Sequence, residues 1–269
     1  MTKNTSCPSE TVMPSTDTID LGRMKEVLSS FGLNFAASNL SEILEASIRD
    51  KLGPAGFLSY LVNNENLNRE ERRIRTGLKL SGLPTGQTLA NFDYSYQPSV
   101  ERAKLEYLST CEWIRMKNSL LIMGPPGVGK THLAVSMGVK AVECGFSVLF
   151  RRMDELLFEM RKDADIAPSR LKRKGYMKTG LLIIDEMGFQ PFSKLDAHLF
   201  FRLVNYRYER GAICITSNKS IRDWPEMFAG DEVLATALLD RLLHHSQVMT
   251  ISGRSYRLKD LEEILKSRN

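Results

Sequence analysis

The sequence contains little cysteine, and its few cysteines are far apart. Cys7, Cys111, Cys144 and Cys214 form no pair at the spacing of metal ligands and no set of close pairs. This argues against a zinc-binding module and against a disulfide-stabilised fold, because both need cysteines at short intervals. We interpret the four thiols as reduced, as is usual in a cytoplasmic protein.

Long apolar segments are also missing. Unbroken apolar runs such as residues 120–123 and 181–184 are short, whereas a membrane-spanning helix needs about 20 apolar residues. Residues 2–6 are polar and do not resemble the apolar core of a signal peptide. We therefore expect a cytoplasmic protein that has no membrane partner.

The chain carries a modest excess of positive charge, and one segment concentrates it. The formal net charge is +5, and residues 161–178 alone contain seven basic and two acidic residues. A concentrated charge attracts a polyanion better than a dispersed one, so this segment is a candidate contact for the phosphates of DNA. A solvated basic loop is the alternative. The candidate DNA-binding residues are Arg161, Lys162, Arg170, Lys172, Arg173 and Lys174.

Hydrophobic periodicity divides the chain into parts. Residues 1–20 are rich in Ser, Thr and Pro and are expected to be a disordered tail, residues 21–80 have helical spacing, and residues 81–99 resemble a linker. From residue 100 to 260 helices and strands alternate, and 261–269 form a C-terminal tail. Alternation of this kind predicts an α/β domain with a parallel sheet flanked by helices, preceded by a small all-helical N-terminal domain. The predicted helices are 100–116, 131–144, 154–161 and 196–210, and the predicted strands are 120–123, 147–150, 181–184 and 212–216.

A phosphate-binding loop lies between the first predicted strand and the helix after it. Residues 124–131 fit the pattern G-x-x-x-x-G-K-[ST] at every fixed position. Glycines let successive backbone N–H groups point at phosphate oxygens, and the helix presents its positive end to the same anion. We therefore predict that ATP and Mg²⁺ bind here, with Lys130 on the β- and γ-phosphates and the Thr131 hydroxyl on the metal ion. The predicted nucleotide-binding residues are Gly124, Pro125, Pro126, Gly127, Val128, Gly129, Lys130 and Thr131.

Two acids follow the buried strand at residues 181–184. Asp185 is expected beside the phosphate-binding loop, because ligands collect at the carboxyl ends of parallel strands, and it is a second candidate for holding Mg²⁺. Glu186 is a candidate general base for the attacking water. A solvated acidic turn is the alternative, which the neighbouring phosphate-binding loop disfavours.

Two other polar residues have weaker signals. Asn218 follows the strand at residues 212–216 and is a candidate partner of the γ-phosphate or the attacking water, although an Asn that caps a turn is common. Arg241 is a candidate arginine finger for a neighbouring subunit, with Asp240 as its possible orienting partner. A pair of solvated charges is the alternative for Arg241 and Asp240.

These motifs in combination resemble the IstB/DnaC group of AAA+ ATPases, most closely the IstB-like transposase helpers. The resemblance covers roughly residues 21–258. The residues that carry it are Asn91 to Pro98 (NFDYSYQP), Gly124 to Thr131, Ile184 to Gly188 (IDEMG), Thr216 to Lys219 (TSNK), Leu238 to His245, and Gly253 to Arg257 (GRSYR).

The resemblance implies roles beyond those that spacing alone indicates. It implies that Asp185 and Glu186 form the Walker B motif, that Asn218 is sensor I and Arg241 an arginine finger, and that Phe92 and Tyr96 lie near the adenine. It implies a homo-oligomer that assembles on duplex DNA in the ATP state and stimulates a transposase of the IstA type, with the helical domain used for assembly. It leaves open whether Arg254 or Arg257 replaces the sensor II arginine of larger relatives.

Other functions remain as alternatives. A replicative helicase loader of the DnaC type shares the same motifs, and a DNA-binding adaptor could hold ATP without hydrolysing it. A small-molecule kinase is disfavoured because no segment has the character of a substrate-binding lid. We find no acidic triad of a nuclease or recombinase, and we expect that the chain does not itself cut DNA.

Overall fold

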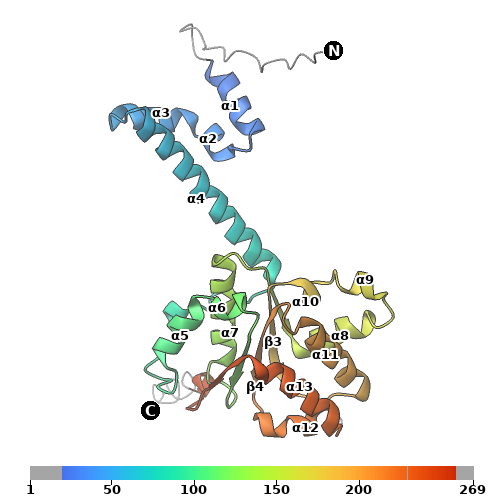
Figure 1. Cartoon of the computed structure of the whole chain (residues 1–269). Helices are drawn as coiled ribbons and strands as arrows, with labels where there is room; N and C mark the ends of the chain where they lie inside the picture. Colours follow the sequence, from blue (N-terminus) through green and yellow to red (C-terminus); the bar gives the residue numbers. More distant parts are fainter. Residues whose placement is uncertain (1–19, 229, 259–269) are drawn as a thin grey trace, which may run out of the picture. The chain divides into compact units, whose positions relative to one another are not determined.

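The computed structural model describes residues 20–228 and 230–258 (Figure 1). Internal contacts divide the chain into two compact units, Met1–Arg73 and Ile74–Asn269. The division falls inside a long helix, α4 (Pro54–Ser81), whereas the sequence placed a domain boundary at its end. In the described part of the chain, every helix is too short or too polar to cross a membrane.

The N-terminal unit consists of helices. It comprises α1 (Leu21–Ser30), α2 (Asn34–Ser38), α3 (Leu40–Arg49) and the first part of α4. Asp20 caps α1, accepting hydrogen bonds from the backbone N–H groups of residues 22 and 23. A small core forms around Ala36, Ile43 and Leu61. The buried Glu65 carboxylate accepts from the Ala36 N–H at 3.0 Å, which ties α4 to α2.

The second unit is built on a five-stranded parallel sheet with the strand order β2-β3-β4-β1-β5. Its strands are β1 (Ser119–Met123), β2 (Val148–Arg152), β3 (Leu181–Met187), β4 (Ala212–Ser217) and β5 (Ser246–Thr250). Nearly every residue of β1, β3 and β4 is buried. These strands are mainly apolar, except for polar residues near their ends, because helices cover both faces of the sheet. The parallel sheet flanked by helices confirms the predicted fold class.

Helices on the two faces enclose two hydrophobic cores (Figure 1). One face is covered by α5 (Arg102–Ser109), α6 (Glu112–Arg115) and α7 (Lys130–Glu143), together with buried or half-buried residues of segment 81–99 such as Phe92 and Leu83. The other face is covered by α8 (Met153–Lys162), α9 (Pro168–Leu171), α10 (Gly175–Lys178), α11 (Lys194–Arg207), α12 (Trp224–Met227) and α13 (Glu232–His244). Two short 3₁₀ helices, η1 (Leu89–Asn91) and η2 (Ile221–Asp223), complete the described elements.

Besides several short helices that were not predicted, such as α9, α10 and α12, the structure has a broken helix and an additional strand. The single helix predicted over residues 100–116 is broken into α5 and α6, because Cys111 adopts a left-handed backbone with φ 59°. The edge strand β5 was not predicted, because three of its five residues are only half-buried and it lacks a long apolar run.

A buried arginine ties the loops at one end of the sheet together. Arg207, at the end of α11, is 1% exposed. Its guanidinium donates to the carbonyl oxygens of Tyr176, Met177, Thr179 and Ala212 at 2.7–3.2 Å. Burial lowers the pKa of Arg207 to about 10, so the side chain stays charged at neutral pH. One cation thereby pairs carbonyls from α10, from the residue after it and from the start of β4.

We expect Arg207→Met to lower the free energy of unfolding of this unit by at least about 3 kcal/mol, because it leaves several buried carbonyls without a donor. Urea denaturation followed by tryptophan fluorescence isolates the unit, because the chain's two tryptophans, Trp113 and Trp224, are both buried in it. The matched control is Arg210→Met, which removes an exposed arginine and is expected to change stability by less than about 0.5 kcal/mol. Equal effects of the two substitutions would contradict a structural role for Arg207.

Candidate functional site

The phosphate-binding loop connects the carboxyl end of β1 to α7. Gly124 has φ 153° and Gly127 has φ 81°. A Cβ atom at Gly124 would collide with the carbonyl oxygen of Ile251, and one at Gly127 would collide with the side chain of Ser255. These two positions therefore require glycine for space as well as for backbone conformation. The segment after β5 is packed directly on the loop.

Lys130 and Thr131 occupy the first turn of α7. The Lys130 ammonium donates to the carbonyl oxygens of Gly124 and Pro125 at 2.8 and 2.7 Å. Burial lowers the pKa of Lys130, with a further contribution from the nearby Arg257, whereas Asp185 opposes the shift. The Thr131 hydroxyl donates to the two carboxylate oxygens of Asp185 at 2.9 and 3.1 Å.

Asp185 is the buried carboxylate of the site. It lies near the end of β3, is 4% exposed, and accepts hydrogen bonds from the hydroxyls of Thr131 and Thr216. A buried carboxylate needs such donors, because an unpaired charge is costly away from water. A carboxylate beside a hydroxyl is the oxygen-rich ligand set that Mg²⁺ prefers. Asp185 and Thr131 therefore fit the metal ion that accompanies ATP.

Glu186 leaves the regular strand geometry. Its φ is 61°, and the pairing of β3 with β4 is irregular between Ile184 and Met187. Its backbone N–H donates to the Thr216 hydroxyl at 3.0 Å. A left-handed backbone at a non-glycine residue costs about 1–3 kcal/mol and is concentrated at functional sites. The bulge lets Glu186 line the nucleotide cavity while Asp185 stays buried against Thr131.

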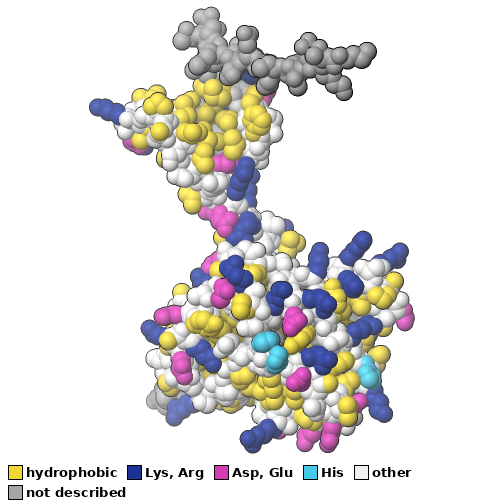
Figure 2. Space-filling view, viewed as in Figure 1, with side chains coloured by type: hydrophobic (Ala, Val, Ile, Leu, Met, Phe, Trp, Pro, Cys, Tyr) yellow, Lys and Arg dark blue, Asp and Glu magenta, His cyan; other side chains and the backbone are white. Residues whose placement is uncertain are grey.

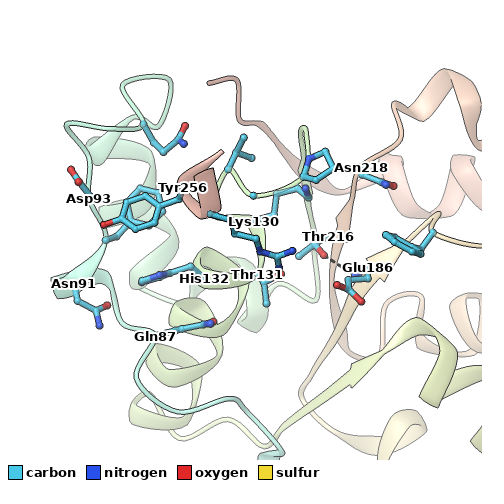
Figure 3. Close-up of a pocket in the computed structure, with 18 residues that line it drawn as sticks. Gln87, Asn91, Asp93, Lys130, Thr131, His132, Glu186, Thr216, Asn218 and Tyr256 are labelled. Atoms are coloured by element: carbon cyan, nitrogen blue, oxygen red, sulfur yellow. Dashed lines mark hydrogen bonds between the residues drawn. The ribbon is translucent and has the colours of Figure 1, made fainter. Parts of the chain in front are cut away.

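These residues surround a cavity of about 320 Å³ (Figure 3). Lys130 and Thr131 lie in its middle, and Glu186, Thr216 and Asn218 form one side. The lining residues include 126–131 of the phosphate-binding loop, whereas Gly124 and Pro125 contribute the carbonyls that hold Lys130. The structure thus brings together the predicted loop, Glu186 and Asn218, with Asp185 directly behind Thr131.

The opposite wall contains residues that the sequence motifs indicated less clearly. Gln87, Asn91, His132 and Tyr256 line it (Figure 3), together with the predicted Phe92. The motifs around residues 91–98 and 253–257 contain Asn91, Phe92 and Tyr256, but neither motif says which ring faces the cavity. Gln87 and His132 lie outside both motifs.

Tyr96 is a support for this wall and is not among its lining residues. Its hydroxyl donates to the carbonyl oxygen of Ser255 at 3.2 Å, and its ring contacts the Tyr256 ring edge-on at 5.3 Å. Of these two tyrosines, Tyr256 lines the cavity. Phe92 and Tyr256 therefore face the cavity, whereas Tyr96 does not line it.

The segment that follows β5 is clamped to the phosphate-binding loop. The Tyr256 N–H donates to the Gly127 carbonyl at 2.8 Å, and the buried Gln97 amide donates to the Arg254 carbonyl at 2.8 Å. The sequence left open whether Arg254 or Arg257 replaces the sensor II arginine. Arg257 lines the cavity, whereas Arg254 is not among the lining residues. Arg257 is thus the second cation at the site besides Lys130.

Arg241 lies elsewhere, near the end of α13. It lines a different cavity, of about 340 Å³, near Ser119 at the start of β1 and Gly211 just before β4. The nucleotide cavity lies at the opposite, carboxyl ends of the same strands. Arg241 is therefore outside the nucleotide site of its own chain.

The predicted DNA-binding cluster consists of paired and unpaired cations. Arg161 forms two hydrogen bonds with the carboxylate of Asp196 at 2.6 and 2.7 Å, which lower the pKa of Asp196, and Lys174 pairs with Asp163 at 2.8 Å. Lys162 lies over the Phe158 ring at 4.1 Å.

The remaining three cations of the cluster, Arg170, Lys172 and Arg173, are exposed and form no ion pair within residues 20–228 and 230–258. Figure 2 shows Lys and Arg side chains gathered over α9 and α10. This part of the surface retains its positive charge.

The fold and this cavity define an ATP-binding P-loop protein of the AAA+ class. The chain belongs to the family of IstB-like ATP-binding proteins, whose sequence profile matches residues 27–263. It is 40% identical over 239 residues to the ATP-binding protein of insertion sequence IS21 from Pseudomonas aeruginosa, covering 88% of this chain and 89% of that protein. It is 38% identical to the IS5376 ATP-binding protein of Geobacillus stearothermophilus, covering 88% and 94%.

Solved structures share the fold at lower identity. The structure of DnaI matches with a TM-score of 0.51 and 20% identity over 61% of this chain and 90% of that chain. AMPPCP-bound DnaA from Aquifex aeolicus matches with a TM-score of 0.51 and 22% identity, covering 69% of this chain and 56% of that one. These similarities support the fold alone.

We expect Lys130→Ala and Glu186→Gln to separate binding from hydrolysis. Lys130→Ala removes the cation that reaches the phosphates, and it should abolish binding of a fluorescent ATP analogue. Glu186→Gln removes the proton acceptor, and it should leave binding within about twofold while lowering turnover at least about a hundredfold. Full turnover by the glutamine variant would rule out Glu186 as the base.

The ion pair between Arg152 and Glu186 gives a second expectation. Arg152 Nη2 lies 2.7 Å from the Glu186 carboxylate, and both side chains are partly exposed. An exposed pair contributes about 0.2–1 kcal/mol. Freeing the carboxylate by Arg152→Ala should therefore raise basal ATP turnover by at most about fivefold without changing ATP affinity. Arg151→Ala is the control, because Arg151 pairs with Glu159 instead. A loss of turnover in Arg152→Ala would mean that Arg152 assists the reaction.

Proposed function

We propose that this protein is an ATPase that helps an insertion-sequence transposase, binds duplex DNA in its ATP state and hydrolyses ATP to leave that state. The observation that carries the proposal is that Thr131 and Glu186 line one cavity, with the buried Asp185 hydrogen-bonded to Thr131 directly behind it. Thr131 and Asp185 fit the metal ion, and Glu186 is free of that role and faces the same space. The family to which the chain belongs, and relatives from insertion sequences, support the biological context.

The chain's own residues suggest how hydrolysis proceeds. Lys130 neutralises charge on the β- and γ-phosphates, and Mg²⁺ held by Thr131 and Asp185 would add a second positive charge there. Glu186 accepts a proton from the water that attacks the γ-phosphorus, and the bond to the β-γ bridging oxygen breaks to give ADP and phosphate. Asn218, on the same side of the cavity as Glu186, is placed to orient that water or the γ-phosphate.

Arg241 acts on a neighbouring copy in this proposal. It lies at the amino ends of the strands, away from its own nucleotide cavity, so it can serve only the ATP of another subunit. Arginine fingers of this kind raise hydrolysis by about 10³–10⁵-fold. Hydrolysis then requires an assembly of several chains, which links the ATP state to oligomerisation on DNA. We assign the N-terminal helical unit to this assembly.

The DNA contact in this proposal is the exposed surface formed by Arg170, Lys172 and Arg173. Of the other three candidates, Arg161 and Lys174 already pair with Asp196 and Asp163, so they contribute less to phosphate binding. The third, Lys162, lies over the Phe158 ring. The transposase partner, of the IstA type, is proposed from the family and from the insertion-sequence relatives.

We expect duplex DNA to stimulate ATP hydrolysis and the stimulation to depend on this surface. Changing Arg170, Lys172 and Arg173 to Ala should weaken DNA binding and reduce the slope of log affinity against log salt by about one per lost phosphate contact. The control removes three exposed arginines elsewhere, Arg75, Arg210 and Arg222. Fluorescence anisotropy with labelled duplex, at several salt concentrations, measures both the DNA affinity and its dependence on salt.

Steady-state ATP hydrolysis, measured without DNA, with duplex DNA and with single-stranded DNA, separates the alternatives. Stimulation by duplex DNA that disappears in Glu186→Gln supports the transposition helper. Stimulation by single strands alone would favour a helicase loader, and ATP binding without hydrolysis under any condition would favour an adaptor. Co-precipitation with a cognate transposase, compared with a replicative helicase, tests the partner.

A further inference from the structure

The guanidinium of Arg241 is held by three contacts. Its Nε donates to the Asn205 side-chain oxygen at 2.9 Å, and its Nη1 donates to the Ala237 carbonyl at 2.8 Å. Its Cζ lies 5.2 Å from the centre of the Phe201 ring. Asn205 and Phe201 belong to α11, whereas Arg241 and Ala237 belong to α13. Within the described residues, Asp240 forms no ion pair with Arg241, so the sequence neighbour is not the orienting group.

A second arginine shows which of these contacts is unusual. Arg210 also donates through Nη1 to the carbonyl four residues earlier, that of Tyr206, at 2.9 Å. Its Cζ also lies 5.2 Å from an aromatic ring centre, that of Tyr206. The helix carbonyl and the ring are therefore ordinary contacts for an arginine in this protein. The bond from Nε to Asn205 distinguishes Arg241.

The Asn205 amide, which accepts the hydrogen bond from Arg241 Nε, is neutral and therefore does not compensate the charge of Arg241. Arg151, Arg152 and Arg161 are each paired with a carboxylate. An amide oxygen fixes the plane of the guanidinium but leaves its positive charge uncompensated. In the described part of the chain, Nη2 of Arg241 donates no hydrogen bond. The half-buried guanidinium, which lines a cavity, thus keeps both a donor and a full charge for an anion.

We propose that Asn205 is the positioning residue of Arg241, which it orients without neutralising. The proposal rests on the proposed function, in which Arg241 contacts the γ-phosphate bound to a neighbouring copy. The rate of ATP hydrolysis falls if a guanidinium that must contact a phosphate across an interface points in the wrong direction, because catalysis depends on geometry at the transition state. The rate also falls if a carboxylate of the same chain pairs with the guanidinium and competes with the phosphate.

The experiment compares Asn205→Ala and Asn205→Asp in the full chain, with saturating ATP and duplex DNA. Both variants should lower kcat by about ten- to a hundredfold, as expected when one hydrogen bond to a charged group is lost or its charge is neutralised. Binding of an ATP analogue and the melting temperature should stay unchanged. Asn205→Asp is decisive, because aspartate keeps an acceptor at the same position. A merely structural hydrogen bond would survive in it, and kcat would be preserved.

Two further variants complete the test. Arg210→Ala, the matched arginine, should retain full kcat. In an Arg241→Ala background, Asn205→Ala should cause no further loss, because the two residues act as one unit.

The results distinguish failure of this inference from failure of the proposed function. If Arg241→Ala keeps full kcat, the trans role of Arg241 is wrong, and the role of Asn205 falls with it. If Arg241→Ala loses activity but Asn205→Ala does not, the proposed function stands and the positioning role of Asn205 is wrong. If Asn205→Ala loses activity but Asn205→Asp does not, the requirement for a neutral acceptor is wrong. Independent, multiplying effects of Asn205→Ala and Arg241→Ala would also overturn the positioning role.

Discussion

The hydrogen bond from Thr131 to Asp185 joins the two halves of the nucleotide site. The two residues are 54 positions apart, one in the first turn of α7 and the other near the end of β3. β4 lies between β1 and β3 in the sheet, and its Thr216 supplies a further hydroxyl to the same carboxylate. A buried charge persists only where donors compensate for lost water. The three elements are therefore held in one arrangement by a carboxylate that none of them could stabilise alone.

The position of Glu186 follows from the hydrogen bonds that fix its neighbour Asp185. With Asp185 directed at Thr131, strict alternation along β3 would turn the next side chain to the other face of the sheet. The bulge and the positive φ of Glu186 change that direction, and the Thr216 hydroxyl accepts the N–H that the bulge displaces. Local backbone strain is thus offset by a hydrogen bond from the adjacent strand. The result is a buried carboxylate against Thr131 and an accessible one that faces the cavity, on consecutive residues.

Four arginines of the second unit illustrate two kinds of acceptor. Arg152 and Arg161 face carboxylates, and their charges are largely compensated within the chain. Arg207 and Arg241 face carbonyl or amide oxygens and keep their charge. Burial makes Arg207 a structural tie, whereas Arg241 remains open to a partner. The same distinction divides the basic segment, where pairing leaves Arg170, Lys172 and Arg173 as the uncompensated surface.

The sequence by itself determined the phosphate-binding loop, the Asp185–Glu186 pair and the parallel sheet, because each depends on residues that are adjacent or regularly spaced along the chain. A buried strand followed by a glycine-rich turn and a helix has few other ways to fold. Tertiary structure alone decided which residues meet across elements. It placed Tyr256 and Arg257 in the lining of the cavity, paired Arg161 with Asp196, and gave Arg241 a partner in Asn205 rather than in its neighbour Asp240. Such contacts depend on how helices pack on the sheet, and no local spacing encodes them.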